Sequence, residues 1–222
     1  MCCWGRALVK NVGLVLLNEP LANLDYKLRE ELRAEIPRIF EQSGAIFVYA
    51  TTEPEDAFSL GGDVAIMREG RATQGRTPKV YREPCVATTV RVFLDPPMNV
   101  TRIEKTGDKI SFGEGQSASA QGALTGLADG DYTGGLRPDH LHLSAKGEDG
   151  LHFLCHLNVT EITGSETFAH LSHGPDHWVG LLHGVQDLTL DAPIEVWLDL
   201  AHVYVFDAQG KLVAPAAFAM AA

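Results

Sequence analysis

The chain has 222 residues, 45% of them hydrophobic, which is enough to bury one large core or two small ones. Its first long apolar run, residues 12–17, is far shorter than the roughly 20 residues of a membrane-spanning helix, and it lacks the basic flank of a secretory signal. The net charge of −11 comes mostly from the part after residue 90, which has 7 basic and 17 acidic residues, so we expect no nucleic-acid partner there.

Residues 1–84 alternate short apolar runs with helical patterns, which predicts an α/β arrangement. Residues 12–17 form the first predicted strand. A helix follows, in which apolar residues recur at helical spacing while charged residues, Arg33 among them, are expected to face water. We expect Pro37 to kink this helix and Gly44 to end it.

A second buried strand is predicted at residues 45–50. A short helix over residues 55–60 should follow, ended by two glycines. Residues 63–67 and 72–74 are then expected to form a hairpin. A further helix is predicted over residues 77–84, because proline suits its first position and a second proline ends it.

The pattern changes near residue 95, where Asp95-Pro96-Pro97 predicts a stiff linker. Short strand-like runs separated by turns follow it, which favours a small β-barrel or sandwich. The predicted strands are residues 99–104, 151–159, 168–172, 178–182, 194–199 and 202–206. The expected fold class is therefore an α/β portion followed by an all-β domain.

One motif carries most of the chemistry, the segment LVLLNEPLANLD at residues 14–25. It resembles the Walker B strand and D-loop of ABC ATPases, in which four apolar residues precede Asp-Glu-Pro and a Leu-Asp pair follows. The resemblance places Glu19 where the family has the glutamate that polarises the attacking water. It places Asp25 in the D-loop, where it would contact a dimer partner. Without the resemblance, Glu19 could be a strand-end acid and Asp25 a helix cap.

Two positions depart from that family. Asn18 stands where a carboxylate normally organises Mg²⁺ through water, and an amide has no charge to hold that water shell. Residues 47–57 resemble the switch region, but Thr52 replaces its usual histidine and cannot carry a proton near neutral pH. Loss of one such transition-state contact typically lowers a rate by on the order of 10²-fold. Together the two departures predict a degenerate catalytic site.

The sequence nowhere contains G-x-x-x-x-G-K-[ST], the loop whose backbone amides hold nucleotide phosphates. The Q-loop and the signature motif are absent too. The segment SLGGD at residues 59–63 looks like part of a signature motif, but it follows the switch region, so we interpret it as the end of a helix. We therefore expect an N-terminally truncated ATPase domain that neither binds nor hydrolyses ATP alone.

The second part extends the resemblance. Residues 93–99, 135–140, 159–167 and 205–207 look like the TOBE (transport-associated OB-type) domain, in family order. The implied fold is the C-terminal portion of an ABC ATPase domain of the P-loop NTPase type at 1–94, followed by an OB-like barrel at 95–222. Such pairings are typical of the maltose, glycerol-3-phosphate and polyol importers. The motifs are most similar to one of two unequal ATPase subunits in bacterial glycerol uptake.

The resemblance implies ATP and Mg²⁺ as cofactors, a second ATPase subunit and membrane permease subunits as partners, and a cytoplasmic place at the inner membrane. Two alternatives remain open. The chain could be a stand-alone regulatory or small-ligand-binding module that uses its β domain. It could also be a gene remnant whose exposed half-core promotes self-association.

All nine histidines lie between residues 140 and 202, and His140-x-His142 suggests metal ligands. No cysteine or carboxylate pair joins them at suitable spacing, so we expect no metal site and ordinary surface histidines. Arg137-Pro138 could bind an anion or form a structural turn. The four cysteines, at 2, 3, 85 and 155, show no metal or disulfide pattern, which favours a reducing compartment.

Overall fold

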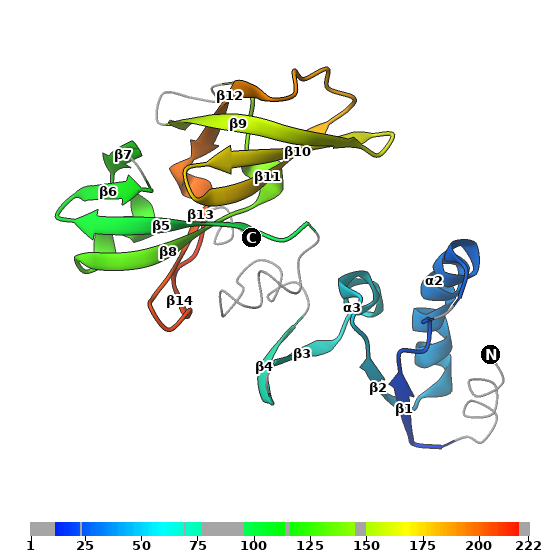
Figure 1. The fold of residues 1–222 in the computed structure, drawn as a ribbon. Helices are drawn as coiled ribbons and strands as arrows, with labels where there is room; N and C mark the ends of the chain where they lie inside the picture. Colours follow the sequence, from blue (N-terminus) through cyan, green and yellow to red (C-terminus); the bar gives the residue numbers. More distant parts are fainter. Residues whose placement is uncertain are drawn as a thin grey trace. The chain divides into compact units, whose positions relative to one another are not determined.

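The computed structural model describes residues 12–22, 24–68, 70–76, 96–113, 116–144 and 150–217. Its contacts divide the chain into two units, Met1–Tyr81 and Arg82–Ala222, whose elements are labelled in Figure 1. The helix predicted over 77–84 lies outside the described residues. The domain boundary after residue 94 also lies there and stays a prediction.

The first unit is a β–α–β–α segment followed by a hairpin (Figure 1). Its elements are β1 (Leu14–Asn18), α2 (Tyr26–Ser43), β2 (Ile46–Ala50), α3 (Pro54–Leu60), β3 (Asp63–Arg68) and β4 (Arg71–Arg76). Strands β1 and β2 pair in parallel, with Leu14 opposite Ile46 and Asn18 opposite Ala50. The predicted strands, helices and hairpin in this range are confirmed within a few residues.

Local chemistry sets the ends of α2. Asp25 Oδ1 accepts a hydrogen bond from the Leu28 N–H at 3.0 Å, which satisfies one of the unpaired amides of the first turn. Gly44 has φ 64°, in the left-handed region that commonly ends helices. Pro37 lies inside the helix, which continues beyond it to Ser43. Both predicted helix ends are thus confirmed.

The parallel strand pair has one covered face and one open face. Helix α2 covers the first face, where Val15 is buried and the rings of Phe40 and Phe47 stack with centroids 3.7 Å apart. The residues of the opposite face, which we call the open face, are 53% to 71% exposed. They are Leu14, Leu16, Ile46 and Val48. Parallel sheets usually bury both faces, so this exposed apolar surface is unusual.

The second unit consists of two antiparallel sheets (Figure 1). The six-stranded sheet has the order β14-β13-β8-β5-β6-β7, and the four-stranded sheet has the order β11-β10-β9-β12. The strands of the first are β5 (Asn99–Thr106), β6 (Lys109–Phe112), β7 (Gln116–Ser119), β8 (Gly130–Leu136), β13 (Val203–Phe206) and β14 (Leu212–Ala214). Those of the second are β9 (Gly150–Ile162), β10 (Glu166–His173), β11 (Asp176–His183) and β12 (Ala192–Asp199).

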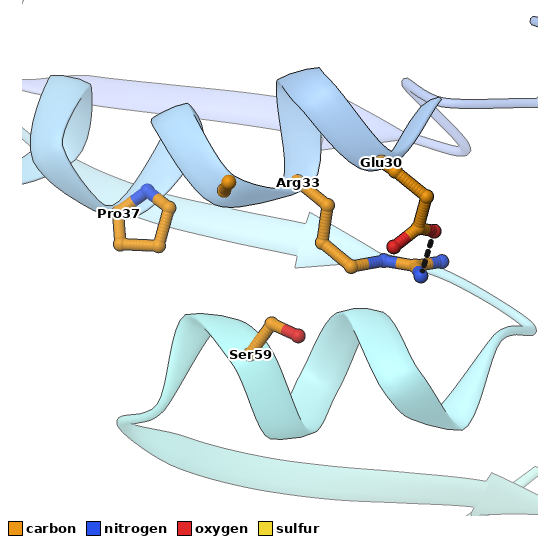
Figure 2. A pocket seen from close by; sticks show the side chains of 5 residues that line it. Glu30, Arg33, Pro37 and Ser59 are labelled. Atoms are coloured by element: carbon orange, nitrogen blue, oxygen red, sulfur yellow. Dashed lines mark hydrogen bonds and ion pairs between the residues drawn. The ribbon is translucent and has the colours of Figure 1, made fainter. Parts of the chain in front are cut away.

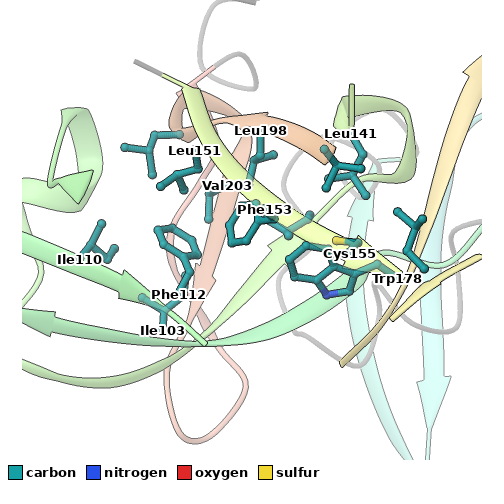
Figure 3. Close-up of a cluster of buried hydrophobic side chains, with 14 of the residues drawn as sticks. Ile103, Ile110, Phe112, Leu141, Leu151, Phe153, Cys155, Trp178, Leu198 and Val203 are labelled. Atoms are coloured by element: carbon teal, nitrogen blue, oxygen red, sulfur yellow. The ribbon is translucent and has the colours of Figure 1, made fainter. Parts of the chain in front are cut away.

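The two sheets enclose one hydrophobic core, shown in Figure 3. Strand β5 alternates buried and more exposed residues, as expected for a strand with one face on a core. At the centre, the Phe153 ring meets the rings of Phe112 and Trp178 edge-on, at centroid distances of 6.3 and 5.1 Å. Edge-on contacts of this kind are favoured by aromatic rings.

All six strands predicted in this part are confirmed, but four others, β6, β7, β8 and β14, were missed. Strand β8 was missed because glycines weaken a strand pattern. A Cβ atom at Gly134 would overlap the Ile103 side chain, and one at Gly135 would lie 2.5 Å from Met98 Sδ. These glycines are needed because neighbouring side chains pack directly against the β8 backbone.

The described chain is therefore mostly β with two α-helices, which is compatible with an α/β portion followed by a β domain. Neither helix in the described ranges has the length and apolar character needed to cross a bilayer.

Candidate functional site

The predicted site lies where the two parallel strands end. Asn18 is the last residue of β1 and pairs with Ala50, the last residue of β2. Glu19 follows directly, and its N–H donates to the Ala50 carbonyl at 2.9 Å. Because the carboxyl ends of parallel strands meet at one edge, Asn18 and Glu19 come together with the loop after β2 that carries Thr52.

The backbone of Glu19 is strained. Its φ is 45°, and Glu19 and Asp191 are the only non-glycine residues in the described part of the chain with positive φ. For a residue with a side chain, the left-handed region is unfavourable by roughly 1 to 2 kcal/mol. The bond to Ala50, together with the Ala22 N–H that donates to the Glu19 carbonyl at 3.1 Å, holds this conformation. Such outliers cluster at functional sites.

The loop after β2 is built around Thr51. The Thr51 hydroxyl donates to Asp56 Oδ2 at 3.0 Å, and Thr51 Oγ1 in turn accepts from the Glu53 N–H at 3.0 Å. Thr52 lies between these two anchored positions and is exposed. Thr52 is therefore exposed to solvent, while Thr51 and Glu53 on either side of it are held by hydrogen bonds.

A tyrosine links this loop to the strand edge. The Tyr49 hydroxyl donates to Asp56 Oδ2 at 3.0 Å. Burial raises the pKa of Tyr49 above its ordinary value, and the charge and hydrogen bond of Asp56 raise it further. The negative charge of Glu19 adds a smaller effect in the same direction, so Tyr49 remains a neutral hydrogen-bond donor here.

Asp25, the fourth predicted site residue, serves as the cap of α2. The structure confirms this structural role. The contact of Asp25 with a dimer partner stays a prediction.

The expectation that Arg33 faces water was wrong. Arg33 is only 9% exposed, because its Nε donates to Asp56 Oδ1 on α3 at 2.9 Å and its guanidinium also donates to Glu55 Oε2 at 2.8 Å. Glu30, one turn earlier on α2, completes the group. The periodicity of α2 could not reveal this, because Glu55 and Asp56 lie more than twenty residues away in the sequence.

Figure 2 shows this arginine at the wall of a pocket of about 300 Å³ between α2 and α3. The pocket is lined by Glu30, Arg33, Ala34, Pro37 and Ser59. Ser59 belongs to the segment that resembled a signature motif, and α3 ends directly after Leu60 with Gly61 at φ 67°. The interpretation of that segment as a helix end is confirmed.

The second unit has a cluster of partly buried histidines. The rings of His140 and His202 stack with centroids 4.0 Å apart. Burial lowers the pKa of His140 to about 4, and the neighbouring charges of His202, Arg137 and His142 act in the same direction against Asp139. In the described ranges, no group of three or more histidine, cysteine, aspartate or glutamate residues is arranged to hold a metal ion.

Two further residues considered in the sequence analysis, Arg137 and Cys155, are buried. Arg137 is buried and its Nε donates to the Tyr204 hydroxyl at 3.3 Å, with the guanidinium over the Tyr204 ring. This contact supports the structural turn for Arg137-Pro138. Cys155 has a buried free thiol. Burial raises the pKa of this thiol to about 11, so it stays protonated.

No protein-family model matches the chain. Among curated proteins, a sulfoquinovosyl glycerol transport ATP-binding protein of Agrobacterium fabrum is 32% identical over 209 residues, which cover 92% of this chain and 58% of that protein. An sn-glycerol-3-phosphate import ATP-binding protein of Cereibacter sphaeroides is 31% identical over 216 residues, with 92% and 57% covered. An uncharacterized ABC transporter ATP-binding protein of Escherichia coli is 28% identical, with 94% and 59% covered. The chain thus spans less than two thirds of the length of these relatives.

Proposed function

Because this chain is homologous to the ATP-binding proteins of ABC importers for sugars and glycerol phosphates, we propose that it is part of such an ATP-binding subunit, one that serves a carbohydrate or polyol such as glycerol. The observation that carries this proposal is Glu19, held in a strained conformation at the end of β1 and bonded through its backbone to the end of β2. A carboxylate carried by a backbone fixed at a strand end is suited to accept a proton from a nearby water.

The residues at this edge are only partly suited to bind the Mg²⁺ of Mg-ATP and to position the attacking water. Glu19 supplies one carboxylate, Asn18 an uncharged amide oxygen and Thr52 a hydroxyl, and oxygen ligands with little charge bind Mg²⁺ weakly. The 222 residues contain no phosphate-binding loop. When bound in such subunits, ATP would supply the phosphoryl group that is transferred, and Mg²⁺ would neutralise the charge that develops on its phosphate oxygens. We assign no step of that reaction to this chain alone.

We assign the second unit to the TOBE type, an OB-like barrel. Two antiparallel sheets around one core support this assignment, as does the position of residues 135–140, where β8 ends and a single 3-10 turn (Pro138–His140) follows. The proposed partners are a second ATPase subunit, reached through Asp25, and the permease subunits of an importer. The proposed location is the cytoplasmic side of the inner membrane.

The proposal is tested by adding back what the chain lacks. Calorimetry at millimolar Mg-ATP should detect no binding to the chain alone, because no backbone-amide nest holds the phosphates. A chimera in which the phosphate-loop and signature segments of an intact ABC ATPase precede residue 12 should bind Mg-ATP. Micromolar binding by the chain alone would contradict the predicted inactivity, and a folded chimera without affinity would contradict the proposed function.

Glu19 can be examined in the same chimera. Glu19→Gln should lower hydrolysis by on the order of 10²-fold and leave nucleotide binding intact, because an amide cannot accept the proton. Glu31→Gln is the matched control, since Glu31 is an exposed residue of α2. Equal hydrolysis rates for the two variants would exclude the assigned role of Glu19.

A further inference from the structure

One buried carboxylate joins three elements of the first unit. Asp56, on α3, is 3% exposed. Its Oδ1 accepts from Arg33 Nε of α2 at 2.9 Å, while its Oδ2 accepts from the hydroxyls of Tyr49 and Thr51 at 3.0 Å each. Asp56 thus connects the middle of α2, the end of β2 and the loop after β2.

The charges at this junction are interdependent. A buried carboxylate needs an opposite charge and hydrogen bonds, and removing either partner leaves the other charge uncompensated. Burial acts to lower the pKa of Arg33, but the hydrogen bond and charge of Asp56 outweigh it and raise that pKa. Glu30 and Glu55 face the same guanidinium from α2 and α3, and Figure 2 shows the bond from Arg33 to Glu30. The Arg33 guanidinium therefore stays positively charged at every physiological pH.

The junction reaches the loop through a short relay. Asp56 accepts a hydrogen bond from the Thr51 hydroxyl and thereby fixes the direction of its O–H bond. The lone pairs of that hydroxyl then accept the Glu53 N–H, which fixes the backbone on the far side of Thr52. Hydrogen bonds linked in series polarise and strengthen one another. The position of Thr52 thus depends on a carboxylate that does not touch it.

We propose that Asp56 is a positioning residue, which couples helix α2 to the loop at residues 51–53 and holds Thr52 in place only while the Arg33–Asp56 ion pair is intact. This inference rests on the proposed function only in giving Thr52 a role at the switch position. The coupling itself is a property of the unliganded chain.

Amide hydrogen exchange, measured by NMR on the full chain without nucleotide, tests the coupling. Asp56→Asn removes the charge at nearly constant size, so the Glu53 amide should exchange on the order of tenfold faster, as expected for the loss of a charge-assisted hydrogen bond. The control is Glu35→Gln, which breaks an exposed pair with Arg38 at 3.5 Å on α2. The same exchange rate in both variants would overturn the proposal.

Thr51 variants keep the test decisive if Asp56→Asn does not fold. Thr51→Val breaks the relay and should speed exchange at Glu53, whereas Thr51→Ser keeps the hydroxyl and should restore the parent rate. Equal exchange rates at Glu53 in the Val and Ser variants would exclude a relay through the Thr51 hydroxyl.

The phenol of Tyr49 provides a spectroscopic readout of the same junction. In Asp56→Asn, or in Arg33→Gln if the first variant is unfolded, NMR of ¹³Cζ-labelled tyrosine should show a changed Tyr49 pKa. The Tyr49 pKa should fall in Asp56→Asn, because this variant removes a negative charge. It should rise in Arg33→Gln, because that variant removes a positive charge. An unchanged pKa would contradict a charged junction. None of these measurements uses ATP, so their failure is distinct from failure of the chimera.

Discussion

The two units bury their hydrophobic residues very differently. The second unit encloses Phe112, Phe153 and Trp178 between two sheets, whereas the described part of the first unit buries only three hydrophobic residues and leaves the open face of β1 and β2 in solvent. The first unit instead gathers a buried ion pair, Arg33–Asp56. Hydrophobic burial therefore stabilises the β unit, while the α/β portion combines a polar junction with an uncovered apolar surface.

The largest effect that would sharpen this comparison comes from the core of the second unit. Phe153→Ala should lower the free energy of unfolding by about 3 to 5 kcal/mol, because it leaves a cavity among packed aromatic rings. Urea denaturation followed by tryptophan fluorescence measures it. The control is Leu154→Ala, the 61% exposed neighbour on the other face of β9, which should change stability by less than about 0.5 kcal/mol. Equal effects of the two variants would contradict a single central core.

An intermediate effect is expected at the open face. Its exposed apolar side chains should drive self-association, and Leu16→Lys with Val48→Lys should weaken that association by about 2 kcal/mol, roughly 30-fold in Kd. Sedimentation and light scattering measure the association. Leu190→Lys, at a 52% exposed position of the second unit, is the control. A parent chain that stays monomeric at high concentration would exclude this surface as a self-association site.

The smallest effect concerns His140. Its pKa of about 4 in the folded state lies below the unfolded value of 6.5, so the unfolded state binds the proton first as the pH falls from 6.5 to 4. The stability present above pH 6.5 should fall through this window by on the order of 1 to 2 kcal/mol, after discounting for the partial exposure of the ring. His140→Gln should lose less over the same window.

The matched control for that measurement is His183→Gln, at an exposed position at the end of β11. Urea denaturation at several pH values between 7 and 4 compares the three proteins. If the parent and His140→Gln lose stability equally, burial of the His140 ring does not oppose its protonation.

Much of the fold could be predicted because local chemistry determines it. The cap at Asp25 and the left-handed Gly44 set the ends of α2 from residues adjacent in the sequence. Strand β8 could not be found this way, since its glycines are explained only by side chains that pack against it. These are Ile103 of β5 and Met98, which directly precedes β5. Packing of this kind joins distant residues and leaves no periodic pattern.

The candidate site was predictable to a similar extent. The motif at residues 14–25 placed Asn18 and Glu19 at a strand end, and the structure puts them there. The burial of Arg33 and the junction at Asp56 were missed, because a charged residue on a helix is usually solvated and the balancing acid lies 23 residues away. Ion pairs between distant residues need the tertiary structure.

At Glu19, the left-handed backbone lowers thermal stability at the same position that carries the proposed catalytic carboxylate. Glycine adopts φ 45° without penalty, so Glu19→Gly should raise the melting temperature while it deletes the carboxylate. Selection of this chain for heat resistance alone would therefore favour variants that have lost the proposed proton acceptor.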